Sequence, residues 1–280
     1  MAQPDPSTSL ERTYRYLRIG VAGTVVVIFV SVLLAAADVG WLTSVSDYYY
    51  TPARTALVGA LIAASLALIA LSGRGVERGL LDAVALFAPL IALVPTTVVP
   101  GSIPGVDAPC PHRCFPPAHE ADAANGVITY LIVGVLVVLV VLLLGALRQV
   151  SLAAIWLSLV FTVVVLGVVA GTWVFARDAF LQQGHFVATI AFFALFAAVS
   201  VMSAFPRGGA PPAPVFRVLY AAIAALLAAV LVAYIAFLPA AEGGIPIILL
   251  AEAAALALFF AFWVVQGIEK WNEDDPAIRG

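Results

Sequence analysis

Ionisable side chains are scarce in this sequence, so those that interrupt its apolar runs are the first candidates for chemistry. The stretch "SVSDYYYTPAR" at 44–54 brings an acid, a base and three tyrosines together between two apolar segments. Glu252 stands alone inside the apolar run "IPIILLAEAAALALFFAFW", and His185 opens an earlier one. A carboxylate, an imidazole and a guanidinium together can hold a polar ligand or transfer protons.

We expect Asp47, Tyr49, Arg54, His185 and Glu252 to line one ligand-binding pocket. Arginine stays charged when it is partly buried and offers a bidentate face to a carboxylate. We therefore predict that Arg54 points into the protein and pairs with Glu252, with Asp47 as a competing or additional partner. The tyrosines are expected to form an interfacial aromatic belt, or to donate a hydroxyl to the same acid or to a ligand.

Two acids fall within apolar segments. An ionisable group inside a membrane span costs roughly 2.5–3.5 kcal/mol on insertion scales, and such groups usually face the bundle interior with a partner. Three interpretations of Glu252 stay open: a buried acid that locks two helices, a group that handles a ligand, an ion or a proton, or a span whose predicted position is wrong. Asp82 follows Arg78 by four residues, which favours a simple pair at the boundary of the span.

Composition indicates the environment of the chain. Of its 280 residues, 64% are hydrophobic and 10% are charged, whereas roughly a quarter are charged in a typical soluble domain. The apolar runs are about as long as the ~20 residues that a membrane-spanning helix needs, and they do not alternate as barrel strands do. The sequence therefore predicts an all-α integral membrane protein.

Eight apolar segments are long enough to span a bilayer, and they predict an eight-helix transmembrane bundle. The predicted spans are 19–38, 54–73, 79–98, 126–147, 151–176, 184–204, 217–238 and 245–267. Short connections join most of them, and no soluble domain fits between them. The predicted transmembrane domain thus covers 19–267, flanked by tails at 1–18 and 268–280.

The basic residues predict which way round the bundle sits. With both tails in the cytoplasm, all Lys and Arg residues but Arg54, Arg113 and Arg177 fall on the cytoplasmic side. Cytoplasmic loops carry the Lys/Arg excess, so this distribution favours an N-in and C-in protein of the cell (plasma) membrane. An even number of spans also places both termini on the same side of the membrane.

The longest predicted loop, 99–125, contains both cysteines of the chain and is expected to be external. Disulfides persist in extracellular environments, so we expect Cys110 and Cys114 to be bonded to each other. Two alternatives stay open: free thiols, or a metal site that also uses His112 or His119. No cofactor is expected, and no motif indicates nucleic-acid binding.

Three stretches carry a resemblance to a known group: "SVSDYYYTPAR", "LLDAVALFAPLIALVPT" and "AEAAALALFFAFWVVQGIEKW". They resemble uncharacterised multispanning membrane proteins that are common in actinobacteria. The resemblance covers most of the chain and implies no activity. It implies that certain residues belong to family motifs, namely Ser44, Ser46, Tyr49, Arg54, Glu252, Trp263 and Glu269.

A weaker likeness is to membrane hydrolases of the alkaline-ceramidase and adiponectin-receptor type. That likeness would give Ser46 and Asp82 the roles of the Ser and Asp that these enzymes place around zinc with three histidines. The His pair that the family has in a late span is missing here, since the only histidines are His112, His119 and His185.

The sequence favours an outward-facing polar pocket that binds, and in one version transports, a small or lipid-derived polar ligand. Span four, and span seven apart from Tyr234, have almost no polar residues in their interiors, which favours a pocket over a through-channel. The first alternative is an accessory or scaffold subunit without a ligand, and the second is a membrane-embedded hydrolase. Binding is favoured over catalysis, and the expected partners are the lipid bilayer and the ligand.

Overall fold

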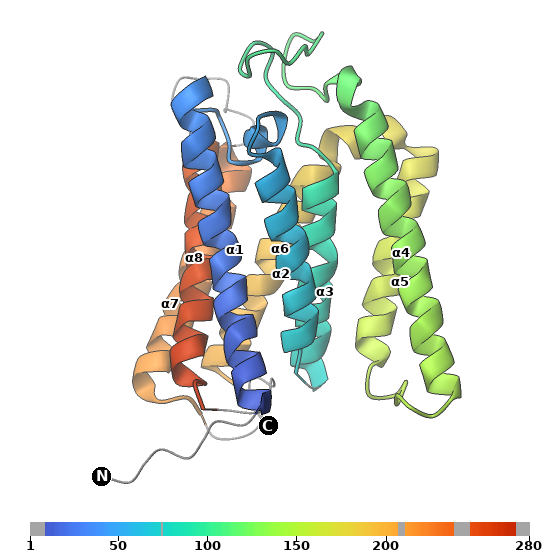
Figure 1. Ribbon diagram of the computed structural model, residues 1–280, viewed down its shortest axis with the longest axis vertical. Coiled ribbons are helices and arrows are strands. Elements are labelled where there is room, and N and C mark those ends of the chain that lie inside the picture. The colour runs from blue at the N-terminus through green and yellow to red at the C-terminus, as the bar shows by residue number, and fades with distance from the viewer. Residues whose placement is uncertain (1–8, 74, 207–210, 238–246, 273–280) are drawn as a thin grey trace.

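The computed structural model describes residues 9–73, 75–206, 211–237 and 247–272, which form eight α-helices and no named strand (Figure 1). The helices are α1 (Ser9–Val39), α2 (Arg54–Leu71), α3 (Gly75–Leu93), α4 (Glu120–Ala146), α5 (Trp156–Phe175), α6 (Arg177–Ala204), α7 (Pro214–Phe237) and α8 (Ile247–Glu269). Two short 3-10 helices, η1 (Ser46–Tyr50) and η2 (Pro117–His119), lie in the connections. The predicted all-helical fold and its eight helices are confirmed.

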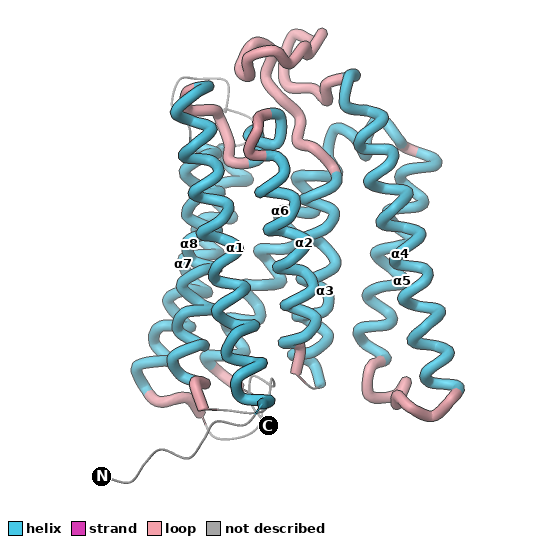
Figure 2. Tube along the Cα trace, in the orientation of Figure 1, coloured by secondary structure: helices cyan, strands magenta, loops and turns pink. Residues whose placement is uncertain are grey.

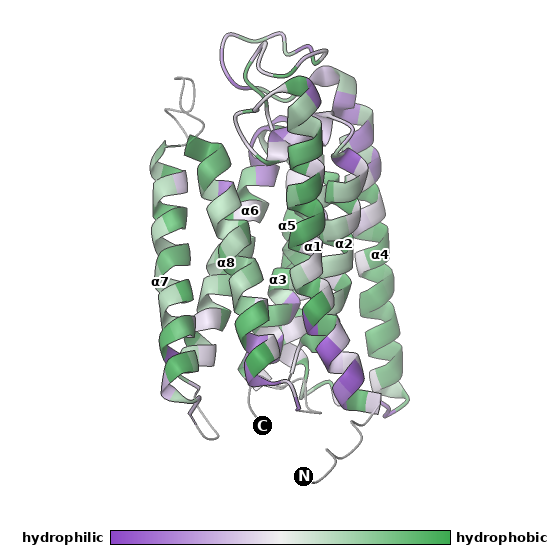
Figure 3. Cartoon of the chain, turned by 60° about the vertical axis from the view of Figure 1, so that its left-hand side comes forward, coloured by the Kyte–Doolittle hydropathy of each residue, from purple (hydrophilic) through white to green (hydrophobic). Residues whose placement is uncertain are grey.

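Seven of these helices are long and apolar enough to cross a membrane. The eighth, α3, carries Glu77, Arg78 and Asp82 within its 19 residues. Figure 3 shows that apolar residues occupy the middle of the helices, while hydrophilic residues gather toward their ends. The structure therefore describes a multi-pass membrane protein.

Six of the helices form a closed ring. In order around the ring, α1, α2, α3, α6, α7 and α8 each pack against the next, and α8 packs against α1. The α4–α5 hairpin lies outside the ring against α3 (Figures 1 and 2). Much of α4 is exposed, for example Leu136 at 54% and Leu143 at 58%. Exposed aliphatic side chains of this kind are typical of a helix surface that faces lipid.

The two ends of the ring differ. The start of α1 and the end of α8 lie at the same end, where the Arg15 guanidinium donates to the carbonyl of Trp271 at 2.9 Å. Arg18, which is buried, donates to the carbonyl of Lys270 at 2.8 Å. The long connection between α3 and α4 caps the opposite end (Figure 1). We call these the termini end and the loop end.

Aromatic side chains fill the ring toward the termini end. Phe196, Phe262 and Trp263 are almost completely buried, with exposed fractions of 0, 0 and 1%. Their rings lie within 4.8–6.3 Å of one another, centroid to centroid. We call these three residues the aromatic plug, because their packed rings fill that part of the ring.

Several helix ends differ from their predicted positions. Helix α6 begins at Arg177, where the sequence predicted a loop up to 183, and α4 begins at Glu120 instead of 126. Helix α1 already includes the residues from Ser9 of the predicted tail. Parts of both predicted tails, and the whole predicted connection between the last two spans, lie outside the described residues.

Helix α3 ends at Leu93, five residues before the predicted boundary. Pro95 explains this, because the residue before a proline is disfavoured in helical conformation and the proline supplies no N–H. The extended segment 94–98 then has free carbonyl groups. Three side chains satisfy them: His185 contacts Val94 O, Tyr50 donates to Thr96 O, and Arg113 donates to Thr97 O. Buried irregular backbone is tolerated in membrane proteins only when it is satisfied in this way.

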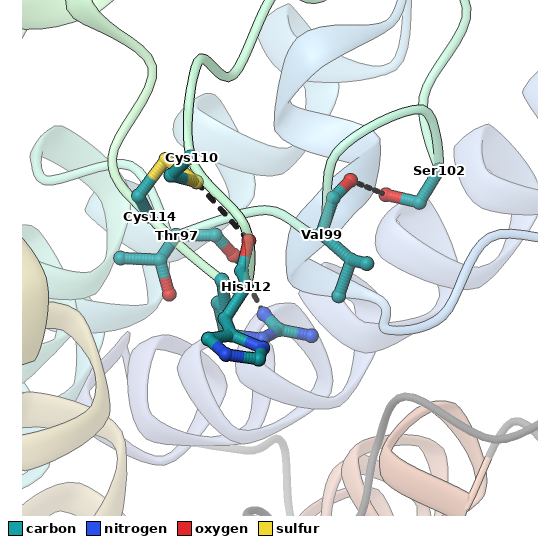
Figure 4. Close-up of a disulfide and its surroundings, with 7 residues drawn as sticks. Thr97, Val99, Ser102, Cys110, His112 and Cys114 are labelled. Carbon is teal, nitrogen blue, oxygen red and sulfur yellow. Dashed lines mark hydrogen bonds between the residues drawn. A yellow bond between two sulfur atoms is a disulfide. The ribbon is translucent and has the colours of Figure 1, made fainter.

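The loop end carries the disulfide between Cys110 and Cys114 (Figure 4). The predicted bond is therefore confirmed. Because both sulfur atoms are used in the bond, the alternatives of free thiols and of a cysteine-bound metal do not apply to this form. The backbone of Cys114 pairs with that of Val98 in both directions, at 2.9 and 3.0 Å, so the disulfide loop is held over the end of α3.

Candidate functional site

Glu252 binds the start of η1 inside the ring. Its Oε2 accepts a hydrogen bond from the backbone N–H of Ser46, and its Oε1 lies 3.0 Å from the hydroxyl oxygen of the same residue. Only 6% of Glu252 is exposed. The carboxylate of α8 is thus held by a residue that precedes α2, so this contact ties η1 to α8 at the loop end of the ring.

His185 contacts the same serine from the opposite side. Its Nδ1 lies 2.7 Å from the carbonyl oxygen of Val94, and a carbonyl can only accept, so Nδ1 carries a hydrogen. Its Nε2 lies 3.0 Å from Ser46 Oγ. The Val94 carbonyl therefore fixes the tautomer of His185 and orients the imidazole toward Ser46.

Glu252, Ser46 and His185 form a hydrogen-bonded chain that needs one extra proton. The two links of the chain each require one hydrogen, and the serine hydroxyl supplies only one of them. If Ser46 donates to Glu252, then His185 Nε2 must be protonated and donate to Ser46. If Ser46 donates to His185, then Glu252 must be a carboxylic acid that donates to Ser46. The arrangement can therefore hold a proton and pass it between the two outer residues through the hydroxyl.

A cavity of about 70 Å³ lies beneath this chain, inside the ring. Ser46 and Glu252 border it at the loop end, and Phe192, Phe193 and Phe259 form part of its apolar wall. Thr189, one turn after His185 on α6, also borders it. The Thr189 hydroxyl is buried and has no hydrogen-bond partner within the described residues. Buried polar groups are usually satisfied, so this hydroxyl indicates a guest such as water or a small solute.

Asp47 is next to this site but does not border the cavity. It is completely buried, it accepts a hydrogen bond from the Thr43 hydroxyl, and its backbone N–H donates to Ser44 Oγ at 2.9 Å. Burial raises the pKa of Asp47 above its ordinary value, and the hydrogen bond from Thr43 and the positive charge of Arg113 partly offset this rise. One carboxylate oxygen has no partner among the described residues.

The predicted pairing of Arg54 with Glu252 is wrong. Arg54 forms an ion pair with Asp122 of α4, with 3.0 Å between Nη1 and Oδ2, and its guanidinium stacks on the ring of Tyr49 at 4.4 Å. Both Arg54 and Asp122 are about two-fifths exposed. Arg54 begins a helix that borders the α4 hairpin, so its side chain reaches an acid outside the ring before it could reach the interior.

The five predicted site residues therefore divide into two groups. His185 and Glu252 meet at Ser46 inside the ring, with Asp47 directly after it in the chain. Arg54 and Tyr49 lie together at a separate cavity between α2 and α4. Tyr48 and Tyr49 are buried in the protein, at 0 and 7% exposure, so they do not form the expected interfacial belt.

The residues that the hydrolase likeness singles out do not meet. Asp82 accepts from Ser158 at 2.6 Å and lies 3.6 Å from Arg78, as predicted for a boundary pair. It precedes Val94, the contact of His185, by twelve residues, or about 18 Å along the helix axis. Among the described residues, no group of three or more His, Cys, Asp or Glu side chains could hold a metal ion.

Sequence reasoning named Ser46 only as a motif residue and as the serine of the hydrolase likeness, and it missed the position of Ser46 at the centre of the site. It also missed Thr189 and the Val94 carbonyl. One signal was available for the last of these: Pro95 predicts an interrupted helix, and an interrupted helix leaves carbonyl groups for side chains to bind. The comparisons with family models, with curated proteins and with solved structures found no match.

Proposed function

We propose that this protein binds a small polar ligand in the cavity inside the ring. The observation that carries the proposal is the unpartnered Thr189 hydroxyl, which shares that cavity with the carboxylate of Glu252 and the hydroxyl of Ser46. A site with two hydroxyls and a carboxylate favours a ligand that donates hydrogen bonds, such as a small amine.

The size of the cavity limits the ligand. Sites for drug-sized molecules occupy roughly 300–1,000 Å³, whereas this cavity measures about 70 Å³. A few water molecules or a solute of a few non-hydrogen atoms fit this space. A whole lipid molecule does not, so the ligand of this site is small.

The ligand enters the cavity from the loop end. The aromatic plug closes the ring toward the termini end, where Phe196, Phe262 and Trp263 are buried. With both termini in the cytoplasm, as the distribution of Lys and Arg favours, the loop end faces the outside of the cell, and we infer that the ligand enters from that end. Binding from outside, without passage through the protein, is the function that this arrangement supports best.

Cysteine accessibility tests this proposal. The chain has no free cysteine among its described residues, so Thr189→Cys introduces a single reactive thiol into the cavity. We expect it to react with a small cationic methanethiosulfonate added from outside. Ser200→Cys is the matched control, because Ser200 is a completely buried hydroxyl residue on the same helix, about 17 Å closer to the termini end. It is expected not to react.

A second variant separates ligand recognition from simple access. In the Thr189→Cys background, Glu252→Gln should lower the rate with the cationic reagent relative to a neutral reagent of the same size. Glu120→Gln, which alters an exposed ion pair with Arg177 on the outside of the ring, should leave that ratio unchanged. An unreactive Thr189→Cys protein would contradict the proposal and favour the scaffold alternative, in which the polar groups serve packing alone.

One observation favours the membrane-embedded hydrolase as a second candidate. Ser46 Oγ lies 3.0 Å from His185 Nε2, and the Val94 carbonyl orients that histidine, which is the geometry of a nucleophile and its base. In such a reaction Ser46 would attack a carbonyl carbon, while its proton passes to His185 and then to the leaving group. Labelling of the wild type, but not of Ser46→Ala, by a fluorophosphonate would support this candidate. Absence of labelling would remove it.

A further inference from the structure

A second, larger cavity lies outside the ring. It measures about 620 Å³ and is bordered by α2, by the end of α3 and by the first turns of α4. Its volume falls in the range of ligand-binding sites. Since it lies between α2 and a hairpin that stands outside the ring, it opens to the side, where a membrane protein meets lipid. We call it the lateral groove.

The polarity of the lateral groove changes along the helices. At the loop end the ion pair of Arg54 and Asp122 spans from α2 to α4, with 3.0 Å between the charged atoms. One to two turns further along α4, Asn125 and Thr129 border the groove and are hydrogen-bonded to each other. Beyond Thr129, α4 exposes only aliphatic side chains, among them Ile132 and Leu136.

This order of groups is the order found in a glycerophospholipid, which has a charged headgroup, then ester groups, then acyl chains. The charged groups of the groove also indicate which headgroup fits it. One positive and one negative side chain lie side by side, each about two-fifths exposed, so each retains bonding capacity toward a ligand. A zwitterionic headgroup complements this pair, whereas an anionic headgroup would place its charge beside Asp122.

We propose that the lateral groove binds a zwitterionic glycerophospholipid with a primary amine, of the phosphatidylethanolamine type, from the leaflet at the loop end. Arg54 binds the phosphate, for which its guanidinium is well suited. Asp122 accepts hydrogen bonds from the ammonium, which a trimethylammonium group could not donate. Asn125 and Thr129 lie at the depth of the esters, and an acyl chain follows the aliphatic surface of α4.

A glycine in the wall of the groove supports this proposal and gives a means to test it. A Cβ atom placed on Gly59 of α2 meets no atom within 4 Å, so the groove is open at that point. Gly126, on the opposite wall, differs: a Cβ there would lie 2.8 Å from the carbonyl oxygen of Leu93. A large side chain at Gly59 therefore occupies the groove without displacing protein atoms.

The first experiment compares two ion pairs at the loop end. Arg177 pairs with Glu120 at 3.0 Å, is similarly exposed, and stacks on Trp173 at 4.5 Å, yet it does not border the groove. The purified protein is exchanged into nanodiscs of phosphatidylcholine with a minor fraction of phosphatidylethanolamine, and native mass spectrometry counts the phosphatidylethanolamine that stays bound. We expect Arg54→Gln to reduce retention about tenfold, the loss of one charged hydrogen-bonding partner. Arg177→Gln should retain the wild-type amount.

The second experiment fills the groove. Gly59→Leu should reduce phosphatidylethanolamine retention as strongly as Arg54→Gln while keeping the wild-type unfolding temperature. Gly167→Leu on α5 is its control. A Cβ at Gly167 also meets nothing within 4 Å, but Gly167 does not border the lateral groove. Equal retention in all variants would overturn the proposal. Preferred retention of phosphatidylglycerol or phosphatidylcholine would overturn it as well, since neither headgroup offers an ammonium donor to Asp122.

Discussion

The hydroxyl oxygen of Ser46 lies 3.0 Å from Oε1 of Glu252, although 206 residues separate the two in the chain. This contact joins the short helix η1 to α8, and the backbone N–H of Ser46 strengthens it through the second carboxylate oxygen. The carboxylate of Glu252 therefore has partners without Arg54.

Glu252→Gln should preserve the fold, because the amide oxygen can accept from the Ser46 N–H and the amide nitrogen can donate to the Ser46 hydroxyl. Glu252→Leu should lower the free energy of unfolding by about 1–3 kcal/mol, since it leaves the buried N–H of Ser46 without an acceptor. Thermal unfolding in detergent, followed by tryptophan fluorescence, measures the difference. Equal losses in both variants would show that side-chain volume, and not hydrogen bonding, determines stability at this position.

Asp47 should make stability depend on pH. Burial raises the pKa of Asp47 in the folded protein above its value of 3.8 in the unfolded chain. Between these two values the folded state binds more protons, so stability should fall as pH rises from about 4 through the folded pKa. The fall is at most about 1.4 kcal/mol per pH unit. Asp47→Asn, which keeps an acceptor for Thr43, should flatten this part of the unfolding curve; a slope equal to that of the wild type would contradict the assignment.

Cys110→Ser should loosen the disulfide loop without unfolding the ring. The bond joins residues four positions apart, and the stabilisation from so short a loop should be at the low end of the usual 2–4 kcal/mol. The backbone pairing of Val98 with Cys114 and the bond from Arg113 to Thr97 do not need the disulfide. Limited proteolysis should therefore cut the loop faster while the unfolding temperature changes little. Cooperative loss of the whole fold on reduction would refute this expectation.

The orientation of the protein in the membrane can be tested by labelling. A tag at either terminus should be accessible from the cytoplasm only, and a tag inserted within 105–109 should be accessible from outside. The predicted excess of Lys and Arg on the cytoplasmic side is the physical reason. Labelling of a terminus from outside the cell would overturn the orientation, and with it the direction of entry into the cavity.

The helices were predictable because each is an apolar run of about the length that a membrane requires. Their ends were less so. The stretch "RDAFLQQG" is polar, which predicted a loop, but it forms the first two turns of α6. His185 consequently lies about 12 Å into its helix instead of at the helix start. Depth in the protein depends on where a helix begins, and polarity alone does not determine this.

The partners of charged residues were predictable only where they are close in sequence. The pair of Arg78 and Asp82 is one helical turn apart, and it is present. The pairing of Arg54 with Glu252 required knowledge of which helices are neighbours. Because α4 and α5 stand outside the ring, α3 packs against α6, and Arg54 faces Asp122 of α4. Hydrophobic periodicity carries no information about that arrangement.

The closure of the ring by contacts between α1 and α8 has a consequence for biosynthesis. At roughly 5–20 residues per second, about 10–40 s pass between synthesis of Ser46 and synthesis of Glu252. During that interval η1 lacks its carboxylate partner, and the side of α1 that α8 will cover faces lipid or a chaperone. A nascent chain that stops before α8 would therefore present an incomplete ring with unsatisfied polar groups, a feature by which membrane quality control can recognise it.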